Sequence, residues 1–190
     1  MPNWTRNVIT ATTDEDFKKI QKLLIGKVDG RTEIDFNILI PMPKELEITS
    51  GSGSLEDNKF GFNKTKFKLI HDSEKDWFDY QRKHYGDKAA LKEAKKQFGA
   101  KSIKYKNCQN LVNHGYKDWY DWSCAKWGTK WNGGGFDMDE KHREIVFNTA
   151  WCQPEPVIIE LAKHANFTHS YEDEDSDGVH ETTYVDGKII

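Results

Sequence analysis

The order of strands and helices at the two ends of the chain constrains the fold most. Residues 3–10 alternate between two faces as a strand does, and residues 12–26 follow as an amphipathic helix with Thr13 at its N-cap position. The same order recurs near the C-terminus, where residues 143–151 predict a strand and residues 154–165 a helix. A repeated strand–helix order favours an antiparallel sheet covered by two helices.

Two further segments complete this sheet. Residues 33–43 predict a second strand, which Pro41 and Pro43 stop, and residues 166–174 and 179–187 predict a terminal hairpin around Ser-Asp-Gly. We therefore expect an α+β fold: a ferredoxin-like antiparallel sheet with two covering helices, a helical insertion after strand two and a C-terminal β-hairpin.

The middle of the chain differs in composition from both ends. A Gly/Ser-rich stretch is followed by two polar segments, 73–86 with Ser73 as N-cap and 87–99, that predict short helices. These segments carry too few apolar residues for a core of their own. We expect residues 1–190 to form a single ferredoxin-like domain in which 44–116 is an inserted, mostly helical segment.

Four tryptophans lie close together in "DWYDWSCAKWGTKW", residues 118–131. Two helices leave part of a four-stranded sheet uncovered, so we interpret Trp119, Trp122 and Trp127 as side chains of a helix (116–127) that packs on the sheet. Trp131 and Lys130 follow Gly128, the predicted end of this helix, and precede glycines at 133–135 that read as a flexible turn. An aromatic beside a cation is typical of binding surfaces, and we predict a partner-binding role for this pair.

The charges are nearly balanced overall but segregated locally. The chain has 28 basic and 31 acidic residues, a net charge of −3, which excludes binding to DNA through a global positive charge. Seven lysines lie between residues 87 and 106, and six acidic residues lie between 170 and 181. The acidic group contributes the other predicted partner-binding residues, Glu172, Asp173, Glu174, Asp175 and Asp177. Three lysines, Lys92, Lys95 and Lys96, form the alternative nucleic-acid-binding site.

Motifs for catalysis or metal binding are weak. Asp173, Asp175 and Asp177 fit the opening of a calcium loop, but Tyr184 stands where that loop needs a bidentate Glu. An acidic hairpin tip, with His169 and His180 near it, is the simpler interpretation. The three cysteines form no CxxC, and no nucleophile motif is present. We therefore expect no metal site, no cofactor and no catalytic residue.

Several motifs together resemble a known family. "MPNW", "IPMP", "YDW…WGTKW", "FNTAWCQPEPVI" and "YEDEDSDG" occur in this order. They are similar to motifs of the YubB-type proteins with a ferredoxin-like domain, found on bacterial phages and plasmids. The family usually has a Cys after the first Trp, where this chain has Thr5, so that position is no essential nucleophile or ligand. The resemblance implies a fold and a mobile-element origin, and no reaction.

These observations leave three functions in competition. The leading hypothesis is a non-enzymatic binding protein of a mobile element, which inhibits a host nucleic-acid-handling or defence protein by presenting its acidic tip as a phosphate mimic. The second is direct nucleic-acid binding, and the third a metal-dependent enzyme built on Asp173, Asp175, Asp177 and His180. The first ten residues lack the apolar run of a signal peptide, and no stretch has transmembrane length, so we expect the cytoplasm of the bacterial host as the location. The expected partner is a host or viral protein, with nucleic acid as the alternative and no membrane.

Overall fold

The computed structural model describes residues 3–28, 30–48, 74–174 and 178–190. The chain divides into two compact units, one formed by Met1–Met42 and Trp122–Ile190 and the other by Pro43–Asp121. Among the described residues, no helix is both long enough and apolar enough to cross a membrane.

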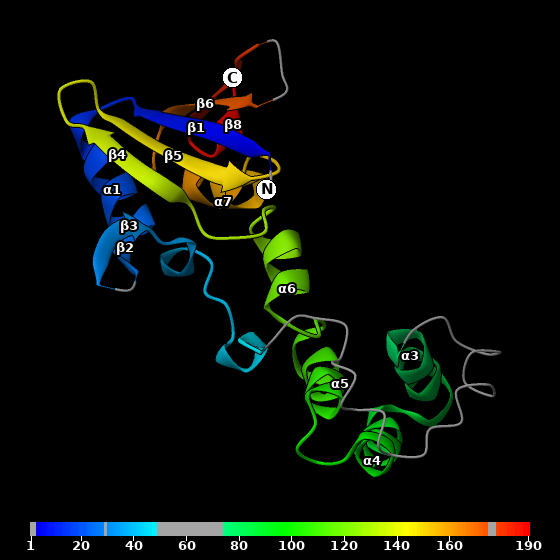
Figure 1. Ribbon diagram of the computed structural model, residues 1–190. Coiled ribbons are helices and arrows are strands. Elements are labelled where there is room, and N and C mark those ends of the chain that lie inside the picture. The colour runs from blue at the N-terminus through cyan, green and yellow to red at the C-terminus, as the bar shows by residue number, and fades with distance from the viewer. Residues whose placement is uncertain (1–2, 29, 49–73, 175–177) are drawn as a thin grey trace. The chain divides into compact units, whose positions relative to one another are not determined.

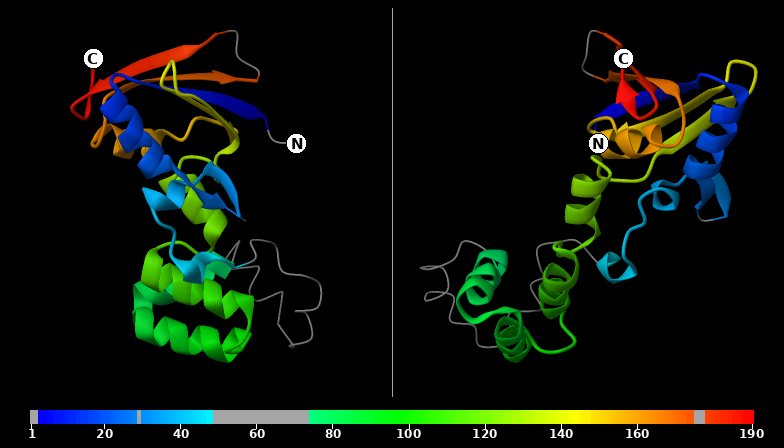
Figure 2. Two further views of the ribbon diagram at one scale, coloured as in Figure 1. Left: turned by 90° about the vertical axis from the view of Figure 1, so that its left-hand side faces the viewer. Right: turned by 180° about the vertical axis from the view of Figure 1, so that it is seen from behind.

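The first unit contains a six-stranded antiparallel sheet in the order β4-β5-β1-β6-β7-β8. Figure 1 shows its two helices beneath one face, and Figure 2 shows the same arrangement from the side. The elements of this sheet and its helices are β1 (Trp4–Ala11), α1 (Asp14–Leu24), β4 (Gly134–Asp139), β5 (Glu144–Ala150), α7 (Glu155–Ala162), β6 (Phe167–Asp173), β7 (His180–Val185) and β8 (Lys188–Ile189). In chain order the first six run β-α-β-β-α-β, and their four strands lie side by side in the order β4-β5-β1-β6, with β5 and β1 in the middle. This is the ferredoxin-like arrangement, and the fold class expected from the sequence is confirmed.

Alternation along the strands separates a buried face from an open one. In β1 the odd-numbered residues are almost fully buried: Ile9 is 1% exposed, whereas Trp4 on the other face is 41% exposed. Cross-strand partners share a face, so Ile145 and Phe147 of β5 join Ile9 in the core. The helices contribute Ile20, Leu24, Ile158 and Leu161 from the other side. The apolar residues that the periodicity assigned to the helix faces are therefore the core.

The second strand of the sheet is not the segment predicted for it. Residues 33–43 were expected to be this strand, but Arg31–Ile34 (β3) pairs with Ile25–Val28 (β2) in a separate two-stranded sheet. The chain then turns into a 3-10 helix, Phe36–Ile38, because the Asp35 carboxylate accepts the backbone N–H of Asn37 and caps it. A local side-chain cap thus overrides the strand-like apolar pattern.

Strand β4 takes that position, from residues that had been interpreted as a flexible turn. The interpretation is wrong because Gly133 lies against the core: a Cβ there would meet Cγ2 of Ile34 at 2.8 Å and Cδ2 of Phe147 at 3.0 Å. Glycine is needed for this close approach rather than for flexibility. The terminal hairpin is confirmed for β6 and β7, while its Ser-Asp-Gly turn lies partly outside the described residues.

The described part of the second unit is helical and contains a buried cluster. Its elements are a 3-10 turn (Lys44–Leu46) and the helices α3 (Glu74–Tyr85), α4 (Asp87–Phe98) and α5 (Ile103–His114). Trp77, Phe78, Ala90, Ala94, Cys108 and Leu111 form a buried cluster, against which Leu91, Phe98, Tyr105 and Val112 pack. The sequence analysis expected no core here, and it did not assign α5, although Ser102 caps the first turn of that helix and Gly115 closes it with a left-handed backbone. The predicted N-cap of α3, Ser73, lies outside the described residues.

The helix α6 (Trp119–Lys126) contains the boundary between the two units. Within the first unit, Trp122 and Trp127 are each 5% exposed and meet edge to face at 5.3 Å, and Trp127 Nε1–H donates to the carbonyl of Ile40. The predicted core role of these two indoles is confirmed. Trp119 is half-buried and packs edge to face on Tyr120.

Candidate functional site

The candidate site lies on the open face of the sheet, opposite α1 and α7, where β1 and β4 begin and β5 and β6 end. The strand register sets Arg6 of β1 between Asn148 of β5 and Glu172 of β6. Trp4 lies two residues before Arg6 and therefore on the same face. Alternation along adjacent strands thus places an aromatic, a cation, an amide and a carboxylate together.

These side chains line a groove of about 490 Å³. Strand β1 contributes Trp4 and Arg6, β5 contributes Asn148, and β4 contributes the glycines Gly134 and Gly135. The end of β6 contributes three consecutive acidic residues, Glu172, Asp173 and Glu174. The groove therefore joins three of the predicted partner-binding residues to residues that the sequence analysis did not single out.

Hydrogen bonds to β1 fix two of the acidic residues. The Thr5 hydroxyl donates to Asp173 Oδ1 at 2.5 Å, and the backbone N–H of Trp4 donates to Glu174 Oε2 at 3.0 Å. The backbone N–H of Glu174 in turn donates to the carbonyl of Trp4 at 3.0 Å. Thr5 is 1% exposed, so its contact orders Asp173 from the buried side of the strand. The position where the resembled family has a Cys thus holds a hydroxyl that orients a groove residue.

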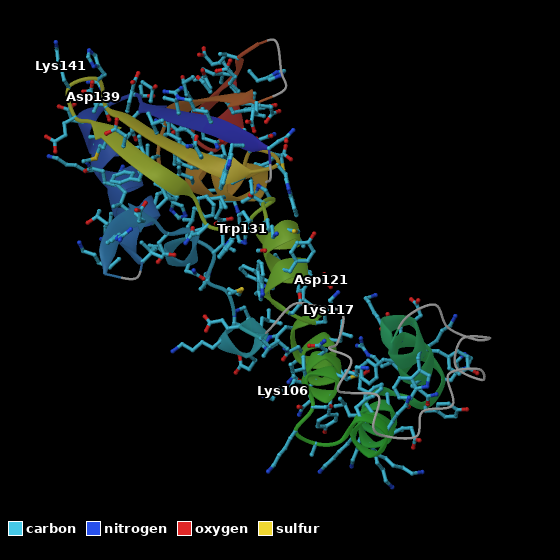
Figure 3. All side chains as sticks on the ribbon, viewed as in Figure 1. Lys106, Lys117, Asp121, Trp131, Asp139 and Lys141 are labelled. Carbon is cyan, nitrogen blue, oxygen red and sulfur yellow. The ribbon has the colours of Figure 1, made fainter. Side chains whose placement is uncertain are left out.

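Three exposed tryptophans, which we call the tryptophan cluster, adjoin the groove: Trp4, Trp131 and Trp151. Their exposed fractions are 41%, 38% and 45%. The rings of Trp4 and Trp131 lie 6.2 Å apart, and Lys130 Nζ lies 4.2 Å from the ring centre of Trp131 and 5.3 Å from that of Trp151. Figure 3 labels Trp131 between α6 and β4. Indole faces carry negative charge that attracts an ammonium, so Lys130 holds two of the rings together.

Trp151 has a backbone conformation that its residue type disfavours. Its φ is +77°, in the left-handed region, and its N–H donates to the carbonyl of Asn3 at 2.9 Å. Two nearby contacts hold the turn: the Thr149 hydroxyl donates to the carbonyl of Cys152, and the Cys152 thiol donates to the carbonyl of Gly128. A bulky non-glycine residue at positive φ costs roughly 1–3 kcal/mol, which the surrounding contacts must offset.

A buried polar network lies behind the groove, on the helix-facing side of the sheet. Asn7 Nδ2 donates to the Thr149 hydroxyl at 2.9 Å and to the carbonyl of Thr5 at 3.0 Å. Its Oδ1 therefore accepts from His169 Nε2, 3.1 Å away, which assigns the proton to that nitrogen. His169 is 3% exposed, and burial lowers its pKa to about 4, so the ring is neutral at pH 7.

The two histidines proposed near the acidic tip are not adjacent. The ring of Tyr171 stacks between them, 5.7 Å from His169 and 4.9 Å from His180, ring centre to ring centre. Within the part of the chain that the structure describes, no three His, Cys, Asp or Glu side chains gather as metal ligands would. Asp175 and Asp177, the other members of the calcium-like string, lie outside the described residues.

The alternative site residues lie in the helical unit. Lys92, Lys95 and Lys96 are exposed on α4, while Ala90 and Ala94 face the core from the same helix. Lys92 also lines a pocket of about 500 Å³ with Trp77 and Tyr85. The lysines thus belong to a different unit from the groove.

The sequence analysis missed Trp4, Arg6, Asn148 and Trp151. Trp4 and Arg6 fall on one face of the alternation in residues 3–10, but each face mixes polar and apolar residues, so the pattern did not mark these two as exposed. For Trp151 the sequence offers no signal, since its exposure depends on the left-handed turn after β5.

Comparison with known proteins finds one family model that matches part of the chain. Residues 126–190 match the family model described as the ferredoxin-like domain in Api92-like protein. The chain is therefore an α+β protein with a ferredoxin-like domain.

Among solved structures, the chain is similar to that of the protein api92 from Yersinia pseudotuberculosis. The match has a TM-score of 0.48 and 11% sequence identity, and it covers 100% of this chain and 96% of the other. A comparison with curated proteins gives no match.

Proposed function

We propose that this protein is a non-enzymatic binding protein that holds a protein partner through the tryptophan cluster. The observation that carries the proposal is Trp151: a large apolar side chain that is 45% exposed on a backbone strained at φ +77°. Neither feature helps the isolated chain, because exposed indole gains little burial and the strain lowers stability. Both are accounted for if the ring packs against a partner.

The composition of the cluster supports a protein as that partner. Tryptophan is the residue type most enriched among interface positions that dominate binding energy, and such residues gather at the centre of a contact. Trp4 and Trp131 extend the apolar area beside Trp151, and the acidic groove supplies a polar rim on one side.

Differential capture from cell lysate tests the proposal. The wild-type chain, a Trp131→Ala/Trp151→Gly variant and an Ile159→Ala control serve as immobilised baits; Ile159 is 48% exposed on α7. We expect a protein retained by the wild type and the control and lost, by tenfold or more in amount, on the double variant. Equal retention on all three baits, with unchanged melting temperatures, would contradict the proposal.

The finer proposal concerns the identity of the partner and the origin of the chain. The YubB-type motifs support a phage- or plasmid-borne protein acting in the bacterial cytoplasm, and the acidic residues Glu172–Glu174 support a nucleic-acid-handling or defence protein as the one inhibited. A partner of this class should release the chain when DNA or RNA is added in excess, because both would occupy the same basic surface. A partner that binds nucleic acid and this chain at once would contradict the phosphate-mimic idea.

The exposed lysines of α4 favour a second candidate function, direct nucleic-acid binding. Spacings of three and four residues place Lys88, Lys92, Lys95 and Lys96 along one side of the helix. A gel shift at low salt, abolished by reversing the charge of Lys92, Lys95 and Lys96 and retained on reversing Lys18, Lys19 and Lys22 of α1, would support it. No shift for the wild type would exclude it.

A further inference from the structure

The groove beside the tryptophan cluster carries a charge that selects its ligand. Its lining contains three acidic residues, Glu172, Asp173 and Glu174, and one cation, Arg6. Asp173 pairs with the buried Thr5, so its carboxylate lies on the helix-facing side, whereas the carboxylates of Glu172 and Glu174 lie on the open face and outnumber Arg6 there. The contact of Glu174 with the Trp4 N–H uses one carboxylate oxygen and leaves the second, and the exposed Glu172 carboxylate stands opposite Arg6 across the β1–β6 pair. Such a lining favours a cation and repels phosphate.

Trp4 provides an aromatic wall for that cation. Its ring lines the groove and is 41% exposed. The chain itself shows that a cation binds the neighbouring rings, because Lys130 Nζ lies 4.2 Å from the ring centre of Trp131. Indole is the aromatic with the strongest attraction for a cation over its face, and the attraction grows when carboxylates compensate the charge from the other side.

The opposite side of the groove is open to the backbone of a ligand. Gly134 and Gly135 begin the edge strand β4, where the register with β5 shifts between Gly134 and Asp137. A Cβ at Gly134 would meet nothing within 4 Å, whereas one at Gly135 would lie 2.9 Å from Asn148 Nδ2. Because these residues have no side chains, a partner chain can approach the strand edge closely enough to extend a side chain into the groove.

We propose that the groove binds an arginine side chain from an extended segment of the partner protein. The guanidinium lies flat on the Trp4 ring and donates hydrogen bonds to the Glu172 carboxylate and to the second oxygen of Glu174. Arginine fits better than lysine because its planar head stacks on indole and donates in a fork that matches a carboxylate. The inference rests on the proposed function, of which it specifies the ligand chemistry.

Titration of tryptophan fluorescence and calorimetry with N-acetylated hexa-arginine, hexa-lysine and hexa-glutamate amides test this assignment at low salt. We expect hexa-arginine to bind about fivefold more tightly than hexa-lysine and hexa-glutamate not to bind. Glu172→Gln should weaken hexa-arginine binding about fivefold. Glu181→Gln, a matched loss of one acid on the same face in β7, should leave it within twofold, because Glu181 is not part of the groove lining.

Trp4→Leu separates stacking from charge. We expect it to abolish the preference for hexa-arginine over hexa-lysine while both still bind. If Glu172→Gln and Glu181→Gln lose the same affinity for hexa-arginine, the attraction is a diffuse one to the acidic hairpin, and the proposal is overturned. The absence of hexa-arginine binding to the wild type would also overturn it. If hexa-arginine does not bind while the Trp131/Trp151 variant still loses its partner, the proposed binding function is supported and the arginine assignment is overturned. If hexa-arginine binds while that variant captures as much partner as the wild type, the arginine assignment is supported and the proposed role of the tryptophan cluster is overturned.

Discussion

Two tryptophans of this chain make opposite contributions to stability. Trp122 is 5% exposed and packs edge to face on Trp127, whereas Trp151 is 45% exposed at φ +77°. We expect Trp122→Ala to lower the free energy of unfolding by about 3–5 kcal/mol. Trp151→Gly should leave it unchanged or raise it by up to about 1 kcal/mol, since glycine adopts the left-handed region freely. Urea unfolding followed by circular dichroism measures both, and a loss above 2 kcal/mol for Trp151→Gly would show that this ring serves the fold.

His169 makes stability depend on pH. Burial lowers its folded-state pKa to about 4, below the ordinary value of 6.5, so between these values the unfolded chain binds a proton that the folded chain does not. The contribution of the neutral His169 to the free energy of unfolding is fully present above pH 6.5. It is lost as the pH falls towards 4, by about 3 kcal/mol over this range. His169→Gln keeps a donor to Asn7 and does not titrate. The difference between the wild type and this variant, from urea unfolding at several pH values, should shrink with falling pH; a constant difference would exclude His169 as the cause.

At the scale of elements, the junction between α6 and α7 is tightly constrained. Gly128 ends the first helix at φ +78°, and a Cβ there would lie 2.7 Å from Cδ of Pro156, at the start of the second. We expect Gly128→Ala to cost about 2–4 kcal/mol, from backbone strain and overpacking together. Gly187→Ala is the control: its φ is +75°, but a Cβ would meet no atom closer than 3.8 Å, so strain alone should cost about 1 kcal/mol. Thermal melts of both variants measure the difference, and equal shifts would remove the steric part of the explanation.

The strands show which elements of this fold sequence periodicity predicts and which it does not. The alternation in residues 3–10 predicts β1, and the two-helix cover follows from the apolar faces of α1 and α7. The second strand was misassigned because Asp35 starts a 3-10 turn inside an apolar pattern. Strand β4 was not assigned because it begins with glycines, and Gly133 just before it packs closely on Ile34 and Phe147. Periodicity reports side chains, and these two elements depend on a cap and on close backbone approach.

For the whole molecule, the two units differ in what their described cores contain. In the part of the helical unit that the structure describes, the main buried cluster has six residues, two of them alanines, and Leu46 is also buried, whereas the sheet unit buries Phe147, Phe167 and many aliphatic side chains. We expect amides of α3–α5 to exchange hydrogen faster than those of β1 and β5. Phe78→Ala, which removes a fully buried ring, should accelerate exchange in α3–α5 while β1 and β5 stay unchanged, and Phe147→Ala should do the converse. Hydrogen-exchange mass spectrometry separates the segments, and uniform acceleration across the chain would show one cooperative structure.

The sequence by itself determined the fold class, the buried indoles and the presence of segregated charge, because these follow from patterns between neighbouring residues. It also placed Trp131 and Lys130 together, since they are adjacent in the chain. Only the tertiary structure decided that Trp4, Trp131 and Trp151 form one surface beside Glu172–Glu174, because strand order and register bring together residues up to 170 positions apart. The exposure of Trp151 likewise comes from a left-handed turn held by contacts with Asn3 and Gly128, which no local pattern encodes.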